Sequence, residues 1–221
     1  MRPVLVLLLA LSWMSLPARA EDWPACGAVA APVYDQSRLS DTARLLAGLG
    51  LPAGSELAAE VPAAALARHR ETLGAGWESL RERQLDAVAA FARTELGEAG
   101  SAATRVWYPF SGPDALYLLR LFPDTREAVM TGLEPVGPVP VLAGLSAEEL
   151  ASSLAEIRRS LQAVLSFSFF RTNDLQVDLK KARFPGVTPL LFVFLAEAGH
   201  AIVDVHHVLL DARGEICVAT P

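Results

Sequence analysis

Hydrophobic residues in the first half of the chain repeat mainly with the period of an α-helix. The first repeat covers residues 39–49, where apolar residues are three or four positions apart, and Gly50 and Pro52 follow it. Gly and Pro are typical of helix ends. A longer repeat covers residues 62–96 and includes Trp77, which we interpret as a core residue. Because this spacing gathers apolar side chains on one face, both segments are predicted to be amphipathic helices.

The pattern changes after residues 97–101, a run of mostly small residues that we interpret as an internal boundary. Residues 105–110 contain Val, Trp, Tyr and Phe, which are typical of strands. Residues 115–122 are almost entirely apolar and predict a short helix, and residues 127–133 predict a second strand. This order predicts a β-α-β unit with parallel strands and a right-handed crossover.

A third long helix is predicted to begin at Ser146 and to continue to residue 168. Ser146 and Glu149 have the spacing of a capping box, in which each side chain binds the backbone N–H of the other residue. Apolar residues then continue at steps of three and four. A shorter helix is predicted over residues 174–183, because polar residues suited to a helix N-cap stand just before it.

The last part of the chain is predicted to be rich in strands. Residues 189–196 are continuously apolar, which is typical of a central strand. Residues 201–210 and 215–219 flank a Gly-containing turn and predict an antiparallel hairpin. The elements together predict an α/β protein: a mixed sheet of about five strands with a β-α-β unit, a C-terminal antiparallel hairpin and an N-terminal helical layer. Residues 21–100 would form an extended lead-in and the helical layer, and residues 101–221 the α/β core.

Residues 1–20 are typical of a signal peptide. Arg2 precedes an unbroken apolar run from Val4 to Leu11, and Ala18-Arg19-Ala20 has the small residues of a cleavage site. The apolar run is shorter than the about 20 residues that a membrane-spanning helix needs. We therefore expect an exported protein, periplasmic or extracellular, with no membrane span after cleavage.

The charge of the chain narrows the classes of partner, and its two cysteines allow a disulfide. The chain has 19 basic and 25 acidic residues, a net charge of −6, and no basic cluster. Such a chain is a poor match for nucleic acid, so we expect a protein or small-molecule partner instead. Cys26 and Cys217 stand near the two ends of the exported part, and an oxidising compartment would favour a disulfide between them. Two free thiols are the alternative.

Two short strings resemble a known group of proteins. Tyr108-Pro109-Phe110-Ser111-Gly112-Pro113-Asp114 and Gly132-Leu133-Glu134-Pro135-Val136-Gly137 look like a family of exported bacterial proteins of unknown function. That resemblance implies no activity, cofactor or site residue. The same region is more loosely similar to the first half of class I methyltransferases, in which a carboxylate after the second strand binds a ribose. This chain has one glycine where several are usual, and a proline at the helix entry, so we expect no cofactor.

The corner between the two strands supplies the candidate catalytic residues. Ser111, Asp114 and Glu134 are predicted to lie together there, and His206 is a further candidate. A hydroxyl, two carboxyls and an imidazole are groups that acid–base and nucleophilic catalysis use. The structural alternative is that Asp114 is stabilised by the dipole of the following helix, while Glu134 binds neighbouring loop amides.

Ligand-binding candidates come from the same corner and from a later polar break. Tyr108 and Gly112 belong to the corner, and Arg171 and Asn173 stand between two predicted helices. These last two residues would line a cleft with the corner if the fold brought them together. The alternative is that they end one helix and cap the next.

Three polar residues near the C-terminus are candidates for a metal site. His200, Asp204 and His206 alternate onto one face of the predicted strand 201–210. An Asp and a His two positions apart could bind a metal or act as an acid–base pair, although a metal would need a further ligand from elsewhere. An ordinary exposed strand is the alternative, and we expect no metal.

Two functions therefore remain open. The favoured hypothesis is a non-catalytic exported protein that binds a partner or a small ligand. The alternative is a small exported hydrolase or transferase that acts at the corner. Catalysis would require Asp114, Glu134 and His206 to share one cavity.

Overall fold

Helices make up most of the part of the chain that the structure describes. In this computed structural model that part comprises residues 34–110, 114–132, 136–167, 183–206, 208–210, 213 and 216–218. Residues 34–205 lie in one compact unit, and the described residues from His206 onward belong to a second unit. The predicted signal peptide and residues 174–182 of the last predicted helix lie outside the described ranges.

The helical segments are, in chain order, η2 (Gln36–Arg38), α1 (Leu39–Leu46), α2 (Glu56–Glu60), α3 (Ala63–Leu80), η3 (Arg81–Leu85), α4 (Asp86–Phe91), η4 (Ala92–Leu96), α5 (Gly97–Ala102), α6 (Asp114–Leu121), α7 (Ala147–Phe167) and α9 (Thr188–Glu197). The segment η2 is a 3₁₀ turn, whereas η3 and η4 are π turns. Within the described ranges, no helix has both the length and the apolar character needed to cross a membrane.

The helix predicted over residues 39–49 is confirmed as α1, although it ends earlier, at Leu46. Gly48, with a φ of 74°, and the next residue donate their N–H groups back to carbonyls of the last helical turn, at 3.0 and 2.8 Å. These two bonds form a Schellman motif, which needs a residue in the left-handed region and so favours glycine. Gly48 rather than Gly50 therefore ends the helix.

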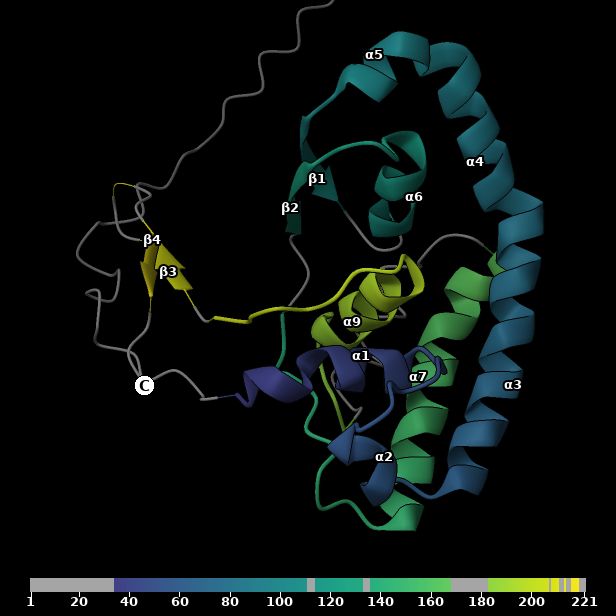
Figure 1. Cartoon of the computed structure of the whole chain (residues 1–221), viewed down its shortest axis with the longest axis vertical. Coiled ribbons are helices and arrows are strands. Elements are labelled where there is room, and N and C mark those ends of the chain that lie inside the picture. The colour runs from purple at the N-terminus through teal and green to yellow at the C-terminus, as the bar shows by residue number, and fades with distance from the viewer. Residues whose placement is uncertain are drawn as a thin grey trace, which may run out of the picture. The chain divides into compact units, whose positions relative to one another are not determined.

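The helix predicted over residues 62–96 is confirmed and is longer than expected. α3 continues through the π turn η3 into α4, and α4 continues through the π turn η4 into α5. Figure 1 shows these segments following one another along one side of the 34–205 unit. An extra residue in a π turn rotates the side chains that follow it, and such turns occur often at functional sites.

The predicted β-α-β unit is present. β1 (Arg105–Phe110) and β2 (Glu127–Gly132) pair in parallel along their full lengths, and α6 connects them. Successive residues of a strand point to opposite faces. Val106 is buried whereas Trp107 is 69% exposed, so one face of this pair is covered and the other is open.

The predicted capping box is confirmed at the start of α7. The backbone N–H of Glu149 donates to Ser146 Oγ at 3.2 Å, and the backbone N–H of Ser146 donates to Glu149 Oε2 at 2.9 Å. These reciprocal bonds satisfy two donors that the start of a helix otherwise leaves unpaired. α7 then packs along α3.

The predicted central strand over residues 189–196 is wrong, because this segment belongs to the helix α9. Most residues of α9 are buried, so no polar face interrupts its apolar run. A helix that is buried all round and a strand that is buried on both faces look alike in hydrophobicity. Pro189, in the first turn, was the available sign of a helix, since its missing N–H is not needed there.

The α/β fold class is therefore wrong as well, and the described part is mainly α-helical. β1 and β2 form one two-stranded sheet, whereas β3 (Val208–Leu210) pairs antiparallel with β4 (Ile216–Val218) in another. The described residues contain no mixed sheet of about five strands that includes the predicted hairpin. The apolar run that was expected to supply the central strand instead supplies a central helix.

Residues 201–205, predicted to begin a strand, form hydrogen bonds with side chains of η2 and α1 instead of with a neighbouring strand. The N–H of Ile202 donates to Ser40 Oγ at 2.8 Å, and the N–H of Val205 donates to Gln36 Oε1 at 3.1 Å. Side chains thus satisfy backbone donors that a sheet would otherwise have satisfied.

The core of the 34–205 unit gathers around α9, which contacts α1, α6 and α7. Figure 1 shows α9 beside α1, with α7 and α3 running next to each other. The largest fully buried side chains are Phe194, Leu45, Leu46, Leu73, Leu80, Leu118, Leu150, Leu154, Leu161, Leu190 and His69.

Two glycines allow the loop before α7 and the loop before α9 to cross in contact. Gly137 has a φ of 72° and Gly186 a φ of 86°. A Cβ at Gly137 would collide with the carbonyl of Pro185, and a Cβ at Gly186 would collide with the backbone of Val136. Thr188 then binds the Val136 carbonyl through its N–H at 3.0 Å and its Oγ1 at 2.6 Å. Gly137, the last residue of the second quoted string, is therefore required by packing.

Candidate functional site

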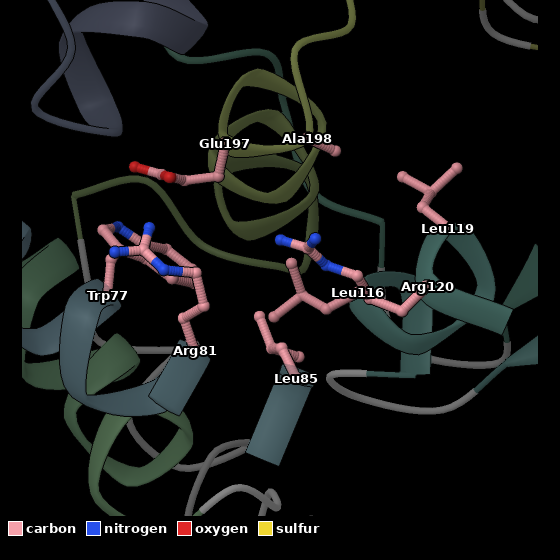
Figure 2. A pocket seen from close by; sticks show the side chains of 8 residues that line it. All are labelled: Trp77, Arg81, Leu85, Leu116, Leu119, Arg120, Glu197 and Ala198. Carbon is pink, nitrogen blue, oxygen red and sulfur yellow. The ribbon is translucent and has the colours of Figure 1, made fainter. Parts of the chain in front are cut away.

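A pocket lies where the end of α3, the helix α6 and the end of α9 meet. Its volume is about 210 Å³, below the about 300–1,000 Å³ that is usual for sites of drug-sized ligands. The residues that line it are Trp77, Arg81, Leu85, Leu116, Leu119, Arg120, Glu197 and Ala198. Figure 2 shows this arrangement from close by. The pocket therefore combines leucine walls with two guanidinium groups, one indole and one carboxyl.

Trp77, one of the lining residues, has an unpaired hydrogen-bond donor. Its side chain is 7% exposed, and its ring meets that of Phe194 edge to face, with centroids 6.4 Å apart. Its Nε1 is buried and has no hydrogen-bond partner among the described residues. An indole N–H can only donate, and a buried donor without an acceptor costs about 1–3 kcal/mol. Because this nitrogen is inaccessible to solvent, Trp77 lines the pocket with its other atoms.

Glu197, at the end of α9, supplies the carboxyl group. The side chain is half-buried, and no hydrogen bond or ion pair joins it to another residue of the described ranges. Burial raises the pKa of this carboxyl to about 7, against the opposing effect of the Arg81 charge. Near neutral pH the group is therefore partly protonated, and it can either donate or accept a hydrogen bond.

The two arginines give the pocket a positive character. Arg81 forms an ion pair with Glu78, one turn earlier on α3, so its charge is partly balanced. Arg120 is exposed, and no ion pair joins it to any other described residue. Figure 2 shows Arg120 reaching into the pocket from the side opposite Arg81, while Glu197 extends over the side where Trp77 and Arg81 lie. The pocket thus offers more hydrogen-bond donors than acceptors.

A second polar group lies close to the pocket, at the start of α6. Gln84, in the π turn η3, donates its Nε2–H to the hydroxyl of Tyr117 at 2.6 Å. Burial raises the pKa of both Tyr108 and Tyr117, and the charge of Asp114 adds to the effect in each case. Tyr108 and Asp114, two of the candidates from the sequence, are therefore close to each other and to Tyr117.

Most of the predicted corner lies beyond the described residues. The candidates outside these ranges are Ser111, Gly112, Glu134, Arg171, Asn173 and Cys26. The convergence of the corner and the Cys26–Cys217 disulfide therefore stay predictions, as does a hydrolase or transferase activity at the corner. Of Cys217, the structure describes only the backbone, within β4.

The three metal-site candidates do not share the face of a strand, because residues 201–206 form no strand. His200, Asp204 and His206 are exposed. The backbone N–H of His200 donates to the Leu195 carbonyl at 2.9 Å, which closes the end of α9, and Asp204 Oδ1 accepts the N–H of the next residue at 2.9 Å. Across the described ranges, no group of three or more His, Cys, Asp or Glu side chains is placed to hold a metal ion.

Sequence analysis missed His69, which is completely buried between α1, α3 and α7. Its Nε2 lies 2.8 Å from the Leu46 carbonyl oxygen, and its Nδ1 lies 3.0 Å from Arg158 Nη1. Arginine only donates, so Nδ1 accepts and Nε2–H donates, which makes the imidazole neutral. Burial lowers the pKa of His69 to about 4, and the Arg158 charge contributes to this shift. This histidine joins helices and has no free ring nitrogen.

The pocket residues Arg81, Arg120 and Glu197 were also missed. The available signal was Glu197, the one charged residue at the end of an otherwise apolar run. Trp77 was assigned to the core, which is correct for its ring. Periodicity says nothing about whether a buried N–H finds an acceptor, so the role of the Trp77 nitrogen was not visible in the sequence.

Comparisons with protein-family models, with curated proteins and with solved structures find no match to this chain. Its function is therefore argued from the geometry of the pocket.

Proposed function

We propose that this protein is an exported, non-catalytic binding protein and that a small molecule binds in the pocket lined by Trp77, Arg81, Arg120 and Glu197. The observation that carries the proposal is a cavity of about 210 Å³ in which leucine side chains stand beside the guanidinium groups of Arg81 and Arg120 and the Glu197 carboxyl. Leucine walls with a few convergent polar groups are typical of ligand sites.

The composition of the lining supports binding rather than catalysis. Among the described residues of the lining there is no Ser, Thr, Cys, Lys or His side chain that would serve as a nucleophile. Glu197 is the only carboxyl among them, and their other ionisable groups are the two arginines, which stay charged. General acid–base catalysis would have to come from Glu197 alone. The pocket is therefore equipped to hold a ligand in a fixed orientation.

A blocking substitution tests the pocket. Ala198 lines the pocket and is exposed, so Ala198→Trp would fill the cavity with little change to the core. Ala201→Trp is the matched control, because Ala201 is also exposed and does not line the pocket. Small metabolites would be screened by their effect on the thermal unfolding midpoint of all three proteins. Ligands should stabilise the wild type and Ala201→Trp but not Ala198→Trp. Equal stabilisation of all three would place binding elsewhere and reject the proposal.

Export rests on the pattern of residues 1–20. Expression of the full chain in a bacterial host, followed by mass measurement of the product, tests this part. Cleavage after Ala20 would give a mature chain that begins at Glu21. A cytoplasmic product that keeps residues 1–20 would contradict export and leave the pocket proposal to be judged by its own experiment.

A further inference from the structure

We propose that the ligand of this pocket is a small organic carboxylate, with its anionic group held by Arg120 and its apolar body against the leucines. This inference rests on the proposed function, because it names the class of ligand for the same site. The balance of donors and acceptors, the distribution of charge and the size of the cavity support it.

The donors of the pocket determine which group of a ligand fits best. The guanidinium groups of Arg81 and Arg120 line the pocket, and both can only donate. Both groups therefore need an acceptor. A carboxylate has two oxygens that accept several hydrogen bonds, and its planar geometry matches a guanidinium.

The charges of the pocket favour an anion over a cation. Glu78 partly balances Arg81, whereas Arg120 has no ion pair within the described part of the chain. The charged side chains that line the pocket with Glu197 are Arg81 from η3 and Arg120 from α6. A cation that paired with Glu197 would have to approach both guanidinium groups, whereas an anion is attracted by them.

The carboxyl of Glu197 can adapt to an anion. Its pKa of about 7 means that little free energy is needed to protonate it near neutral pH. A protonated Glu197 no longer repels a carboxylate and offers it a further donor. Binding of an anion should therefore be tighter at pH 6 than at pH 8.

The size and the walls of the cavity limit the rest of the ligand. About 210 Å³ is small for a ligand site. Leu85, Leu116 and Leu119 supply apolar surface beside the polar groups. A compact apolar or aromatic body with one carboxylate satisfies both conditions.

A charge series of nearly equal shape tests the ligand class. Benzoate, benzamide and benzylamine carry a negative, a neutral and a positive polar group on the same ring. Binding of each to the full-length mature protein would be measured by calorimetry at pH 6 and pH 8. Benzoate should bind most tightly, and several-fold more tightly at pH 6. Tighter binding of benzamide or benzylamine would overturn the carboxylate assignment.

Four substitutions complete the experiment. Arg120→Gln should weaken benzoate binding at least about tenfold, since it removes charged hydrogen bonds. Arg126→Gln is its matched control, because it removes the same charge at an exposed residue outside the pocket lining. Trp77→Phe keeps an aromatic ring and removes only the inaccessible N–H, so benzoate binding should be nearly unchanged. Glu197→Gln should keep binding and lose the difference between pH 6 and pH 8.

Failure of this inference and failure of the proposed function give different results. If none of the three compounds binds, but other ligands from the metabolite screen are blocked by Ala198→Trp, the pocket is a ligand site and the carboxylate class is wrong. If Arg120→Gln and Arg126→Gln weaken benzoate binding equally, the anion is attracted by overall charge and the assignment to this pocket is overturned. If Ala198→Trp has no effect on any ligand, both proposals fall.

Discussion

The buried face of α3 carries two polar side chains that differ in their hydrogen bonding. His69 and Trp77 both lie on it, with Leu73 between them. His69 is fully buried, and both of its ring nitrogens are bonded to groups on neighbouring helices. Trp77 is nearly as buried, but its nitrogen has no partner among the described residues, and the residue lines a cavity. Burial alone therefore does not show whether a polar side chain is hydrogen-bonded.

The pKa values of His69 and Glu197 shift in opposite directions for the same reason. Burial disfavours the charged form of each. It lowers the pKa of His69 to about 4 and raises the pKa of Glu197 to about 7. Both side chains are therefore held toward their neutral forms. The His69 region should lose stability in acid, and the pocket region should lose stability as the pH rises from about 4.5 to about 7.

Removal of the His69 ring should have the largest effect. His69→Ala leaves a cavity, an unpaired Leu46 carbonyl and an Arg158 without its acceptor, so we expect the free energy of unfolding to fall by about 3 kcal/mol or more. Urea denaturation at pH 7 measures the change. His200→Ala, at an exposed side chain, is the control and should be within about 0.5 kcal/mol of the wild type. A small effect of His69→Ala would show that its bonds do not hold the helices together.

Acid should weaken the wild type through His69. Below about pH 6.5 the unfolded chain binds a proton that the folded chain rejects down to about pH 4. The contribution of His69 is therefore present above pH 6.5 and is lost as the pH falls toward 4, by about 3 kcal/mol in total. Denaturation curves at successive pH values would show this slope. The slope should be reduced in His69→Ala, and an unchanged slope would assign it to other groups.

A rise in pH from about 4.5 to about 7 should weaken the pocket region, with a smaller effect. The folded chain keeps the Glu197 proton up to about pH 7, whereas the unfolded chain releases it near 4.5. This contribution is present below pH 4.5 and is lost as the pH rises through 7. Because the side chain is only half-buried, we expect Glu197→Gln to gain about 1 kcal/mol relative to the wild type between pH 5 and pH 8. Glu148→Gln, at an exposed carboxyl, serves as the control, and an equal gain there would contradict the assignment.

The smallest stability change is expected from Trp77→Phe. The substitution keeps an aromatic ring against Phe194 and removes the unpaired N–H, so loss of packing and relief of the unpaired donor oppose each other. Thermal and urea unfolding should agree within about 1 kcal/mol with the wild type. A loss as large as that of His69→Ala would mean that the Trp77 nitrogen is satisfied in solution. In that case the contrast between the two polar side chains would disappear.

Local signals in the sequence were sufficient to locate several of the helices and strands. The helical repeats located α1 and the long helix that begins with α3, and Ser146 with Glu149 located the start of α7. The order of strand, apolar helix and strand located the parallel pair of β1 and β2. These features depend on residues close together in the chain, through periodicity, capping and short connections, and the sequence therefore contains them directly.

Only the tertiary structure decided three features that have no local signal: the helical state of residues 189–196, the crossing of two loops and the pocket. The run 189–196 becomes a helix because other helices surround it, and periodicity cannot distinguish this environment from the interior of a sheet. The crossing of Gly137 with Gly186 joins loops far apart in sequence. The pocket likewise combines Trp77 with Glu197, more than one hundred positions away. Whether a buried polar group is bonded or left open depends on such distant partners, and only the folded chain brings them together.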